Sequence, residues 1–305
     1  MQPVLRETAL TNAPADRPGH VIGLDLGGTK LLGAIASTEG GLIAEMSEPT
    51  GPDAFAQVVA MGRALMGAAG VAGVAHLALG VPGAVAPDGR VFLAPNVHFG
   101  TDPRLGAALT LVLGCEVSVW NDCNAAAYGE YDGQGSLAFV ALGTGIGIGL
   151  ILNGHLVTGR SGAAGEIAYL PFGSDPYARA RAHPEGGFEA LVGTRALRAA
   201  LPGSPDVREI FARVEAGDAA AAAVVERLTD DLAAGLAATI ALVDPGLVVL
   251  GGGIGSRAGL AERLVPKVAA LVPTPCTIRA SRFGDRAGLM GALALARRLA
   301  RQEVA

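Results

Sequence analysis

The chain has 305 residues and half of them are hydrophobic, so it is long enough for one large or two ordinary domains with a sizeable core. Its formal net charge is −5 and it contains no basic run. That balance argues against a nucleic-acid partner but not against phosphate ligands, because backbone amides can hold a phosphate group. The three cysteines form no even framework and no Cys-x-x-Cys pair, so we expect reduced thiols in a cytoplasmic protein.

The sequence contains no segment that predicts secretion or membrane insertion. Residues 1–20 carry charges and prolines without an apolar signal core, so we interpret them as a flexible leader. The longest apolar run, residues 236–254, is interrupted by Asp244-Pro245-Gly246. It predicts a helix, a turn and a strand rather than a membrane span.

Residues 21–36 predict a strand, a tight glycine turn and a returning strand. Gly27 and Gly28 are expected to turn the backbone with positive φ and to leave no Cβ in the way of a ligand. Asp25 lies inside the apolar run just before the turn, where a carboxylate needs a cation or a hydrogen-bond partner. The pattern suggests a backbone cradle for phosphate with a carboxylate aimed at its metal, although an ordinary hairpin explains this segment about equally well.

Two better-known glycine motifs are excluded at this turn. Gly23 and Gly28 have the spacing of a Walker loop, but the following Thr29-Lys30 is in reversed order and leads into strand-like residues. The Gly-x-Gly-x-x-Gly spacing of a dinucleotide fingerprint is absent, and no helix follows.

Residues 116–120 predict a strand that runs directly into Asn121-Asp122, and residues 124–131 predict a helix. Ligands of open α/β sheets gather at the carboxyl ends of strands, which places Asp122 where it could act. An Asp at the start of a helix is also a common cap, and this segment alone supports both interpretations equally.

Residues 137–154 repeat the opening pattern of strand, glycine turn and strand, with the turn at Gly143-Thr144-Gly145. The two copies lie roughly a domain's length apart. This duplication predicts two similar α/β halves that face each other, each offering a phosphate loop to a shared cleft.

The remaining segments predict the borders of that cleft. Glu166 lies in a loop of small residues and is interpreted either as a solvated acid or as an acceptor for a ligand hydroxyl. Residues 170–187 contain three prolines and predict an irregular loop beside the pocket. Residues 247–250 predict a buried strand that ends in residues 251–253, three glycines that let a ring or a ribose approach the backbone.

Five segments together carry a resemblance to a known family. Three resemble the phosphate and adenosine motifs of the actin-like sugar kinase ATPases: Asp25-Leu-Gly-Gly-Thr-Lys30, Gly143-Thr-Gly-Ile-Gly147 and Asp244-Pro-Gly-Leu-Val-Val-Leu-Gly-Gly-Gly253. Two more are similar to the ROK family (repressor, open reading frame, kinase): Trp120-Asn-Asp-Cys-Asn-Ala-Ala-Ala-Tyr-Gly-Glu130 and Gly162-Ala-Ala-Gly-Glu-Ile167. Each motif is weak alone, but all five in this order are strong evidence, and the resemblance runs from about residue 21 to the C-terminus.

The resemblance implies an α/β fold with two duplicated actin-like (ribonuclease H-like) domains around a central nucleotide and sugar cleft. The N-terminal domain is expected over residues 21–121 plus 289–305, and the C-terminal domain over residues 122–288. Hinge candidates lie near Asn121 and residues 284–288. Closure of the two halves around sugar and ATP would exclude water from the γ-phosphate.

The same resemblance implies ATP- and Mg²⁺-dependent phosphorylation of a sugar hydroxyl, with Asp122 as the catalytic base and Asp25 holding Mg²⁺ through water. Phosphoryl transfer relies on positioning and charge stabilisation, so an ionised Asp within hydrogen-bond reach suffices. The residues implied for ATP and phosphate are Gly27, Gly28, Thr29, Lys30, Thr144, Gly145, Gly251, Gly252 and Gly253. The residues implied at the sugar are Asn96, Asn121, Asp122, Glu166, Tyr169 and Glu189.

The chain departs from the family pattern after Glu166, where the family continues as Gly-Glu-x-Gly-His and then a zinc-binding cysteine cluster. Tyr169 stands in place of the histidine, and no cysteine occurs between residues 170 and 189. His183 alone cannot make a structural zinc site, which usually needs four protein ligands, so we predict no zinc. Gly186-Gly-Phe-Glu189 still resembles the end of the zinc segment, which keeps Glu189 at the sugar.

The constellation of Asp25, Asp122 and the glycine turns predicts a hexose kinase acting on the 6-hydroxyl of glucose or a close relative. The alternatives are a kinase for fructose or an N-acetylhexosamine, and a catalytically silent sugar-sensing ROK protein. Regulators of the family carry an added helix-turn-helix, and about twenty residues before Val21 are too few for that module. The expected partner is a small sugar. Family members are often dimers, so the resemblance is also compatible with a homodimer.

Overall fold

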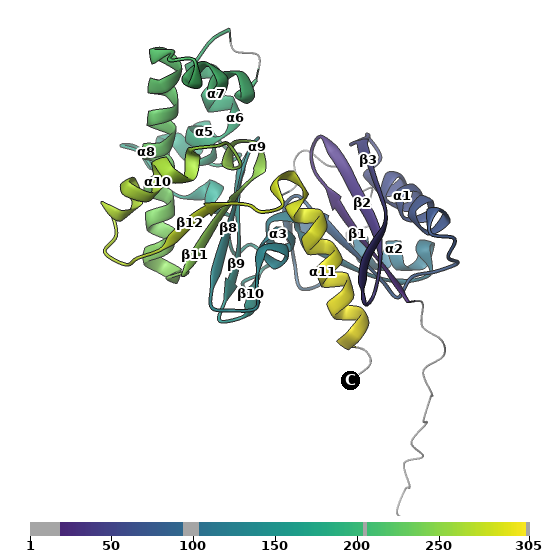
Figure 1. Ribbon diagram of the computed structural model, residues 1–305. Coiled ribbons are helices and arrows are strands. Elements are labelled where there is room, and N and C mark those ends of the chain that lie inside the picture. The colour runs from purple at the N-terminus through teal and green to yellow at the C-terminus, as the bar shows by residue number, and fades with distance from the viewer. Residues whose placement is uncertain (1–18, 94–103, 204–205, 303–305) are drawn as a thin grey trace, which may run out of the picture.

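The computed structural model describes residues 19–93, 104–203 and 206–302. It contains two five-stranded sheets, with helices α3 (Asp122–Glu130) and α11 (Ala287–Gln302) lying between them (Figure 1). Residues 1–18 of the predicted leader and Asn96 lie outside the described ranges, whereas strand β1 (His20–Leu26) already begins inside the predicted leader. Within those ranges, no helix combines the length and the apolar character that a membrane crossing requires.

The first sheet has the strand order β3-β2-β1-β4-β7. β1 pairs antiparallel with β2 and parallel with β4, while β2–β3 is antiparallel and β4–β7 is parallel. Strand β1 is an almost continuous buried apolar run because helices cover both faces of this sheet. The bounds of its strands are β1 His20–Leu26, β2 Lys30–Ser37, β3 Gly40–Pro49, β4 His76–Val81 and β7 Glu116–Asn121.

The second sheet repeats this arrangement in the order β10-β9-β8-β11-β12. β8 again pairs antiparallel with the strand that follows it and parallel with the strand on its other side, and β10–β9 and β11–β12 keep the same directions. The duplicated α/β fold expected from the two glycine turns is therefore confirmed. The bounds of its strands are β8 Leu137–Leu142, β9 Ile146–Leu152, β10 His155–Val157, β11 Leu247–Gly251 and β12 Thr277–Ala280.

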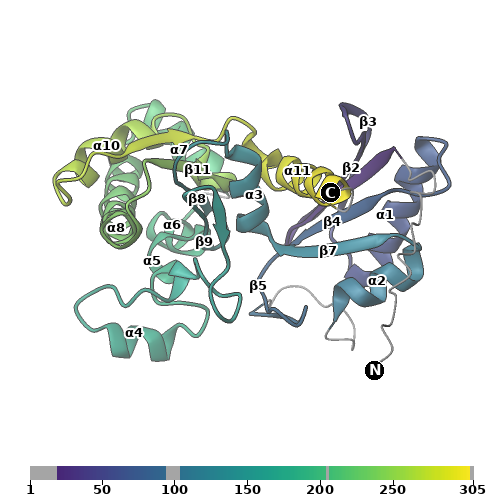
Figure 2. The same cartoon turned by 90° about the horizontal axis from the view of Figure 1, so that it is seen from below.

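Helices enclose the outer faces of both sheets, as Figure 2 shows from below. Helices α1 (Ala54–Ala68) and α2 (Leu105–Leu113) cover the first sheet, and α8 (Ala219–Val243) buries its apolar residues in the large core of the second half. The other elements of the second half are η1 Ile167–Tyr169, α5 Glu189–Val192, α6 Thr194–Ala200, α7 Val207–Glu215, α9 Gly252–Gly255, α10 Leu260–Ala269 and η2 Gly284–Arg286. A short hairpin of β5 (Ala84–Val85) and β6 (Val91–Phe92) extends from the first half.

The two central helices approach each other closely because glycines face the contact. A Cβ built on Gly129 of α3 would lie 2.7 Å from the backbone nitrogen of Gly291 in α11. A Cβ on Gly291 would overlap the carbonyl oxygen of Ala125. These glycines allow the helix that begins at Asp122 to lie directly against the C-terminal helix. The domain boundaries at residues 121/122 and 288/289 stay a prediction, although they fall close to the ends of β7 and the start of α11.

The segment 170–187 is less irregular than its sequence predicts. Helix α4 (Pro176–Ala182) occupies its centre, so the prediction of a loop throughout is wrong. Asp175 caps the helix by accepting a hydrogen bond from the backbone N–H of Ala178 at 2.8 Å. Pro176 stands at the first helical position, where its fixed φ and missing N–H do no harm, so this proline starts a helix instead of ending one.

Candidate active site

The first glycine turn joins β1 to β2 and leaves an open edge. The backbone N–H of Gly27 donates to the carbonyl of Lys30 at 2.9 Å, and the Thr50 hydroxyl donates to the carbonyl of Gly27 at 2.6 Å. Neither Gly27 nor Gly28 has a positive φ, so that part of the prediction is wrong. A Cβ on Gly28 would meet no protein atom within 4 Å, which leaves the space beside this exposed turn free for a ligand.

Lys30, at the end of this turn, pairs with an acid from the far end of the chain. Its Nζ lies 2.6 Å from Oδ2 of Asp285, in the segment that leads into α11. Both side chains are partly exposed, so the pair contributes little to stability. It does hold the first turn next to the segment that links the two halves.

The second glycine turn, Gly143 to Gly145, joins β8 to β9 and is hydrogen-bonded to the junction between α5 and α6. The backbone N–H and the hydroxyl of Thr194 donate to the Gly143 carbonyl at 2.9 and 2.8 Å. Oε2 of Glu189 accepts from the backbone N–H of Ile146 at 3.2 Å, and a Cβ on Gly145 would overlap this carboxylate. Glu189 therefore contacts the second turn itself, a contact that the sequence analysis did not predict. Thr194 was missed as well, because it belongs to no recognisable local motif.

The glycine segment 251–253 lies beside the second turn. A Cβ on Gly143 would be 3.5 Å from the backbone nitrogen of Gly253, although more than a hundred residues separate them. Gly252 has a φ of 80°, and a Cβ there would press on the carbonyl of Leu142 at 2.5 Å. The chain can only make this turn with a glycine. Gly253 is exposed, and a Cβ on it would meet nothing within 4 Å, so a flat ligand group has access to its backbone.

Asp122 is the first residue of α3 and lies between the two halves. Asn121 is the N-cap, since its Oδ1 accepts from the N–H of Asn124 at 2.9 Å, so Asp122 is not needed as the cap. The Asn121 amide nitrogen donates to the Gly83 carbonyl at 3.0 Å and lies 3.2 Å from Oδ1 of Asp122. Oδ1 also accepts from the Cys123 N–H at 2.7 Å. The carboxylate is thus oriented through Oδ1, and its other oxygen has no partner among the described residues.

Four of the predicted site acids have raised pKa values. Burial raises the pKa of Asp122, and burial together with the charges of Asp122 and Glu189 raises the pKa of Glu166. Burial also raises the pKa of Glu189. Burial, and then the charge of Asp122, raise the pKa of Asp25 to about 7. The charge of Asp122 thus acts on both Asp25 and Glu166, and Lys30 partly offsets the charge of Asp25; we refer to these four acids as the acidic cleft.

Asp25 is the acid in this cleft that best fits a metal cation. Its carboxylate is half-buried and packed against the first turn of α11, since a Cβ on Gly288 would overlap it. A Cβ on Gly80 would lie 3.5 Å from its Oδ1. Hard cations such as Mg²⁺ bind through one or two carboxylates while keeping several waters. An ion at the open side of Asp25 would offset the repulsion between Asp25 and Asp122, so the residues present fit Mg²⁺.

The remaining predicted sugar residues lie around the acidic cleft. Glu166 precedes the short helix η1, and Tyr169 at the end of η1 has 47% of its surface exposed. Burial, and then the charges of Glu166 and Glu189, raise the pKa of Tyr169. The roles of Asn121, Asp122, Glu166, Tyr169 and Glu189 at a sugar stay a prediction. Asn96 lies outside the described residues.

Comparison with known proteins identifies the family of the chain. The ROK family profile matches residues 21–299. The curated N-acetyl-D-glucosamine kinase of Erwinia tasmaniensis is 32% identical over 301 residues, which cover 88% of this chain and 97% of that protein. The glucokinase of Streptomyces coelicolor is 29% identical over 315 residues, which cover 92% of this chain and 98% of that protein.

Solved structures agree with this match. The ROK hexokinase from Thermus thermophilus superimposes with a TM-score of 0.76 at 29% identity, covering 93% of this chain and 99% of that one. A ROK family glucokinase from Streptomyces griseus, solved in complex with glucose and AMPPNP, has a TM-score of 0.71 at 28% identity, covering 92% of this chain and all of that one. The chain belongs to the ROK family, as its five motifs predict. These relatives are sugar kinases, in agreement with the class of enzyme expected from the sequence.

Proposed function

We propose that this protein is an ATP-dependent hexose kinase that transfers the γ-phosphoryl group of ATP to a sugar hydroxyl, most simply the 6-hydroxyl of glucose. The observation that carries the proposal is the placement of Asp122. Its carboxylate lies on the first turn of α3, is oriented through one oxygen by two donors, and keeps the second oxygen available within an acidic cleft between the two glycine turns.

In the proposed reaction Asp122 is the general base. Its free oxygen accepts the proton of the sugar hydroxyl as that hydroxyl oxygen forms a bond to the γ-phosphorus. The bond between the γ-phosphorus and the bridging oxygen of ATP breaks, and ADP leaves with the electron pair. Burial raises the pKa of Asp122 and so strengthens it as a base. The two donors on Oδ1 hold the carboxylate in one orientation, which matters because phosphoryl transfer depends on positioning.

The glycine segments have separate roles in this proposal. Backbone N–H groups of Gly28, Thr29, Thr144 and Gly145 hold the phosphates, while Gly27, whose N–H bonds the Lys30 carbonyl, shapes the first turn. Residues 251–253 lie against the second turn and flank the adenosine. Asp25 would hold Mg²⁺, and the bound ion would supply positive charge to the phosphate groups.

The sugar is held by hydroxyl acceptors that come from different elements. We assign Glu166 and Glu189 as acceptors beside Asp122, whose charge raises the pKa of Glu166, and Tyr169 to the same site, since the charges of both glutamates raise its pKa. Buried polar groups of this kind discriminate between sugars, because a missing hydroxyl leaves an acceptor unpaired. The N-acetyl-D-glucosamine kinase among the relatives supports a second candidate, a kinase for an N-acetylhexosamine, and fructose is a third.

The test is a coupled assay of ADP release with Mg²⁺-ATP across glucose, fructose, mannose, N-acetylglucosamine and N-acetylmannosamine. We expect sugar-dependent turnover with at least one of them. The variant Asp122→Asn should lose about 10²-fold or more of kcat, the range typical for removal of a general base, while it still binds sugar in calorimetry.

The matched control is Asp206→Asn, the same change of acid to amide at another helix N-terminus. Asp206 caps α7 by accepting from the Glu209 N–H at 3.0 Å, and α7 packs against α6 and α8. Its kcat should stay within about two-fold of the wild type. Sugar binding without turnover in the wild type would instead support a silent, sugar-sensing protein.

A further inference from the structure

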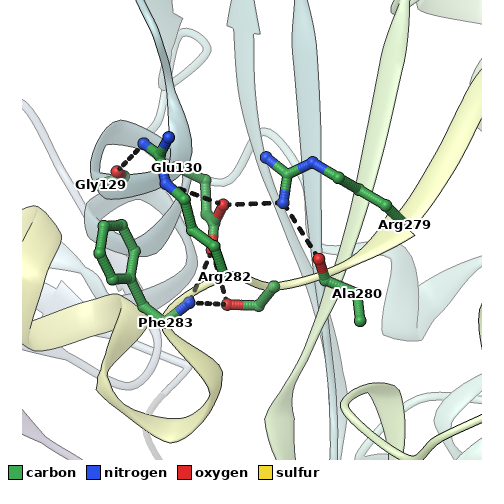
Figure 3. Close-up of polar contacts among 7 residues, drawn as sticks. Gly129, Glu130, Arg279, Ala280, Arg282 and Phe283 are labelled. Atoms are coloured by element: carbon green, nitrogen blue, oxygen red, sulfur yellow. Dashed lines mark hydrogen bonds and ion pairs between the residues drawn. The ribbon is translucent and has the colours of Figure 1, made fainter.

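A buried acid at the far end of α3 has no role in the reaction as proposed above. The side chain of Glu130, the last residue of α3, has 0% of its surface exposed. Oε1 accepts from the Ser281 hydroxyl at 2.6 Å and from the Phe283 N–H at 3.4 Å (Figure 3). Oε2 lies 3.1 Å from Nη1 of Arg279 and 3.6 Å from Nε of Arg282. Every one of these partners comes from the segment that follows β11 in the second half.

Glu130 stands where an acid is unfavourable. The C-terminal end of a helix carries partial negative charge, so a carboxylate there is destabilising, and burial adds a further cost. The last turn of α3 has no basic residue of its own to compensate. Compensation comes from Arg279 and from Arg282, which also donates to the free carbonyl of Gly129 at 3.0 Å. An acid at a helix C-terminus that is stabilised by arginines from a distant segment indicates a position that depends on the tertiary structure.

The contacts of Glu130 connect the two parts of the candidate active site. Asp122 and Glu130 are the first and last residues of the same short helix. Ser281, which donates to Glu130, uses its own backbone N–H to bond the carbonyl of Leu250 at 2.7 Å. Leu250 immediately precedes glycines 251–253. The chain of bonds from Glu130 through Ser281 to Leu250 therefore links the helix of Asp122 to the segment that flanks adenosine.

We propose that Glu130 is a positioning residue that sets the orientation of α3 and so holds Asp122 at a defined place relative to the nucleotide. The inference rests on the proposed kinase function. With the carboxylate in place, α3 and the 279–283 segment move as one body during any closure of the two halves. Without it, two half-exposed arginines lose their shared partner, the end of α3 is released, and Asp122 loses its alignment with the γ-phosphate.

The test compares Glu130→Gln with the wild type at saturating substrates and by calorimetry. We expect kcat to fall about 10- to 100-fold, the range that follows from small misplacement of a reacting group. The affinity for sugar should change less than about three-fold, because Asp122 is the predicted sugar residue on α3, whereas Glu166, Tyr169 and Glu189 lie on other elements. Ser281→Ala removes a single hydrogen bond and should lower kcat in the same direction by a smaller factor. In the double variant the two effects should be less than additive, since both act through one contact.

The matched control is Glu226→Gln, which removes an acid paired with Lys267 across α8 and α10 in the same half. Its kcat should equal that of the wild type. A Glu130→Gln protein that loses thermal stability but keeps its kcat would reduce Glu130 to a structural role and overturn the inference. A proportional rise of KM at constant kcat would also overturn it. These results differ from failure of the proposed function, in which the wild type itself shows no sugar-dependent turnover.

Discussion

Replacing Asp25 by asparagine should stabilise the ligand-free protein while destroying its activity. Burial and the neighbouring charge of Asp122 raise the pKa of Asp25 from 3.8 to about 7. A carboxyl group with a raised pKa in the folded state binds more protons than in the unfolded chain. The stability of the folded state therefore falls as the pH rises from about 3.8 to about 7. Asparagine has the same shape and no charge, so it removes this cost.

The magnitude follows from the size of the shift. A change of about three pKa units corresponds to about 4 kcal/mol when Asp25 is fully ionised, at about 1.4 kcal/mol per unit. Near pH 5.5 only about half of that cost is present, because the native carboxyl is still protonated. Water that reaches this half-buried group reduces the effect. We expect the stability advantage of Asp25→Asn to grow by about 1 to 2 kcal/mol between roughly pH 5.5 and pH 8.

The assay is urea unfolding of both proteins at the two pH values without nucleotide or metal, in which the midpoint reports the change in stability. Adding Mg²⁺-ATP should stabilise the wild type and leave Asp25→Asn almost unchanged, and kcat of the variant should fall about 10²-fold or more. Asp218→Asn is the control, since hydrogen bonds from Ala221 and Arg213 lower the pKa of Asp218 and its loss should destabilise the protein. An Asp25→Asn protein that is less stable than the wild type, or whose advantage does not depend on pH, would refute the reasoning.

Four further substitutions test the packing of the central helices and the geometry of the cleft. Gly28→Ala should keep the wild-type melting temperature and weaken ATP binding, because the added methyl enters empty space beside the first turn. Gly291→Ala should lower the free energy of unfolding by about 2 kcal/mol or more, because its methyl overlaps α3. Tyr169→His should change kcat/KM ratios among the sugars of the panel without changing the KM for ATP; an unchanged ranking would remove Tyr169 from the sugar site. Glu189→Gln should raise the KM for ATP as well as for sugar, because Glu189 also holds the Ile146 N–H at the second turn; an effect on sugar alone would contradict that second role.

The local pattern of the sequence was sufficient for the class of fold and for the family. Each glycine turn lies between two apolar strands, and this arrangement is visible because strand periodicity and turn chemistry act over a few neighbouring residues. The repeat of the pattern predicted two similar halves, and the sheet orders confirm it. A local pattern gives a wrong prediction when the same residue type is common in two kinds of local structure. Pro176 predicted a loop but starts α4, and Gly27 and Gly28 turn the chain without positive φ.

Only the tertiary structure decided how these elements meet. Burial raises the pKa values of Asp25, Asp122 and Glu166, and the charge of Asp122 raises those of Asp25 and Glu166 further. No sequence pattern encodes either effect, because both depend on which distant groups surround a carboxylate. The same is true of Glu130. The motif Gly129-Glu130 can be read from the sequence, but its partners lie about 150 residues further along the chain and become neighbours only when β12 joins the second sheet. Local propensity specifies elements, whereas the energy of a buried charge is a property of the packed molecule.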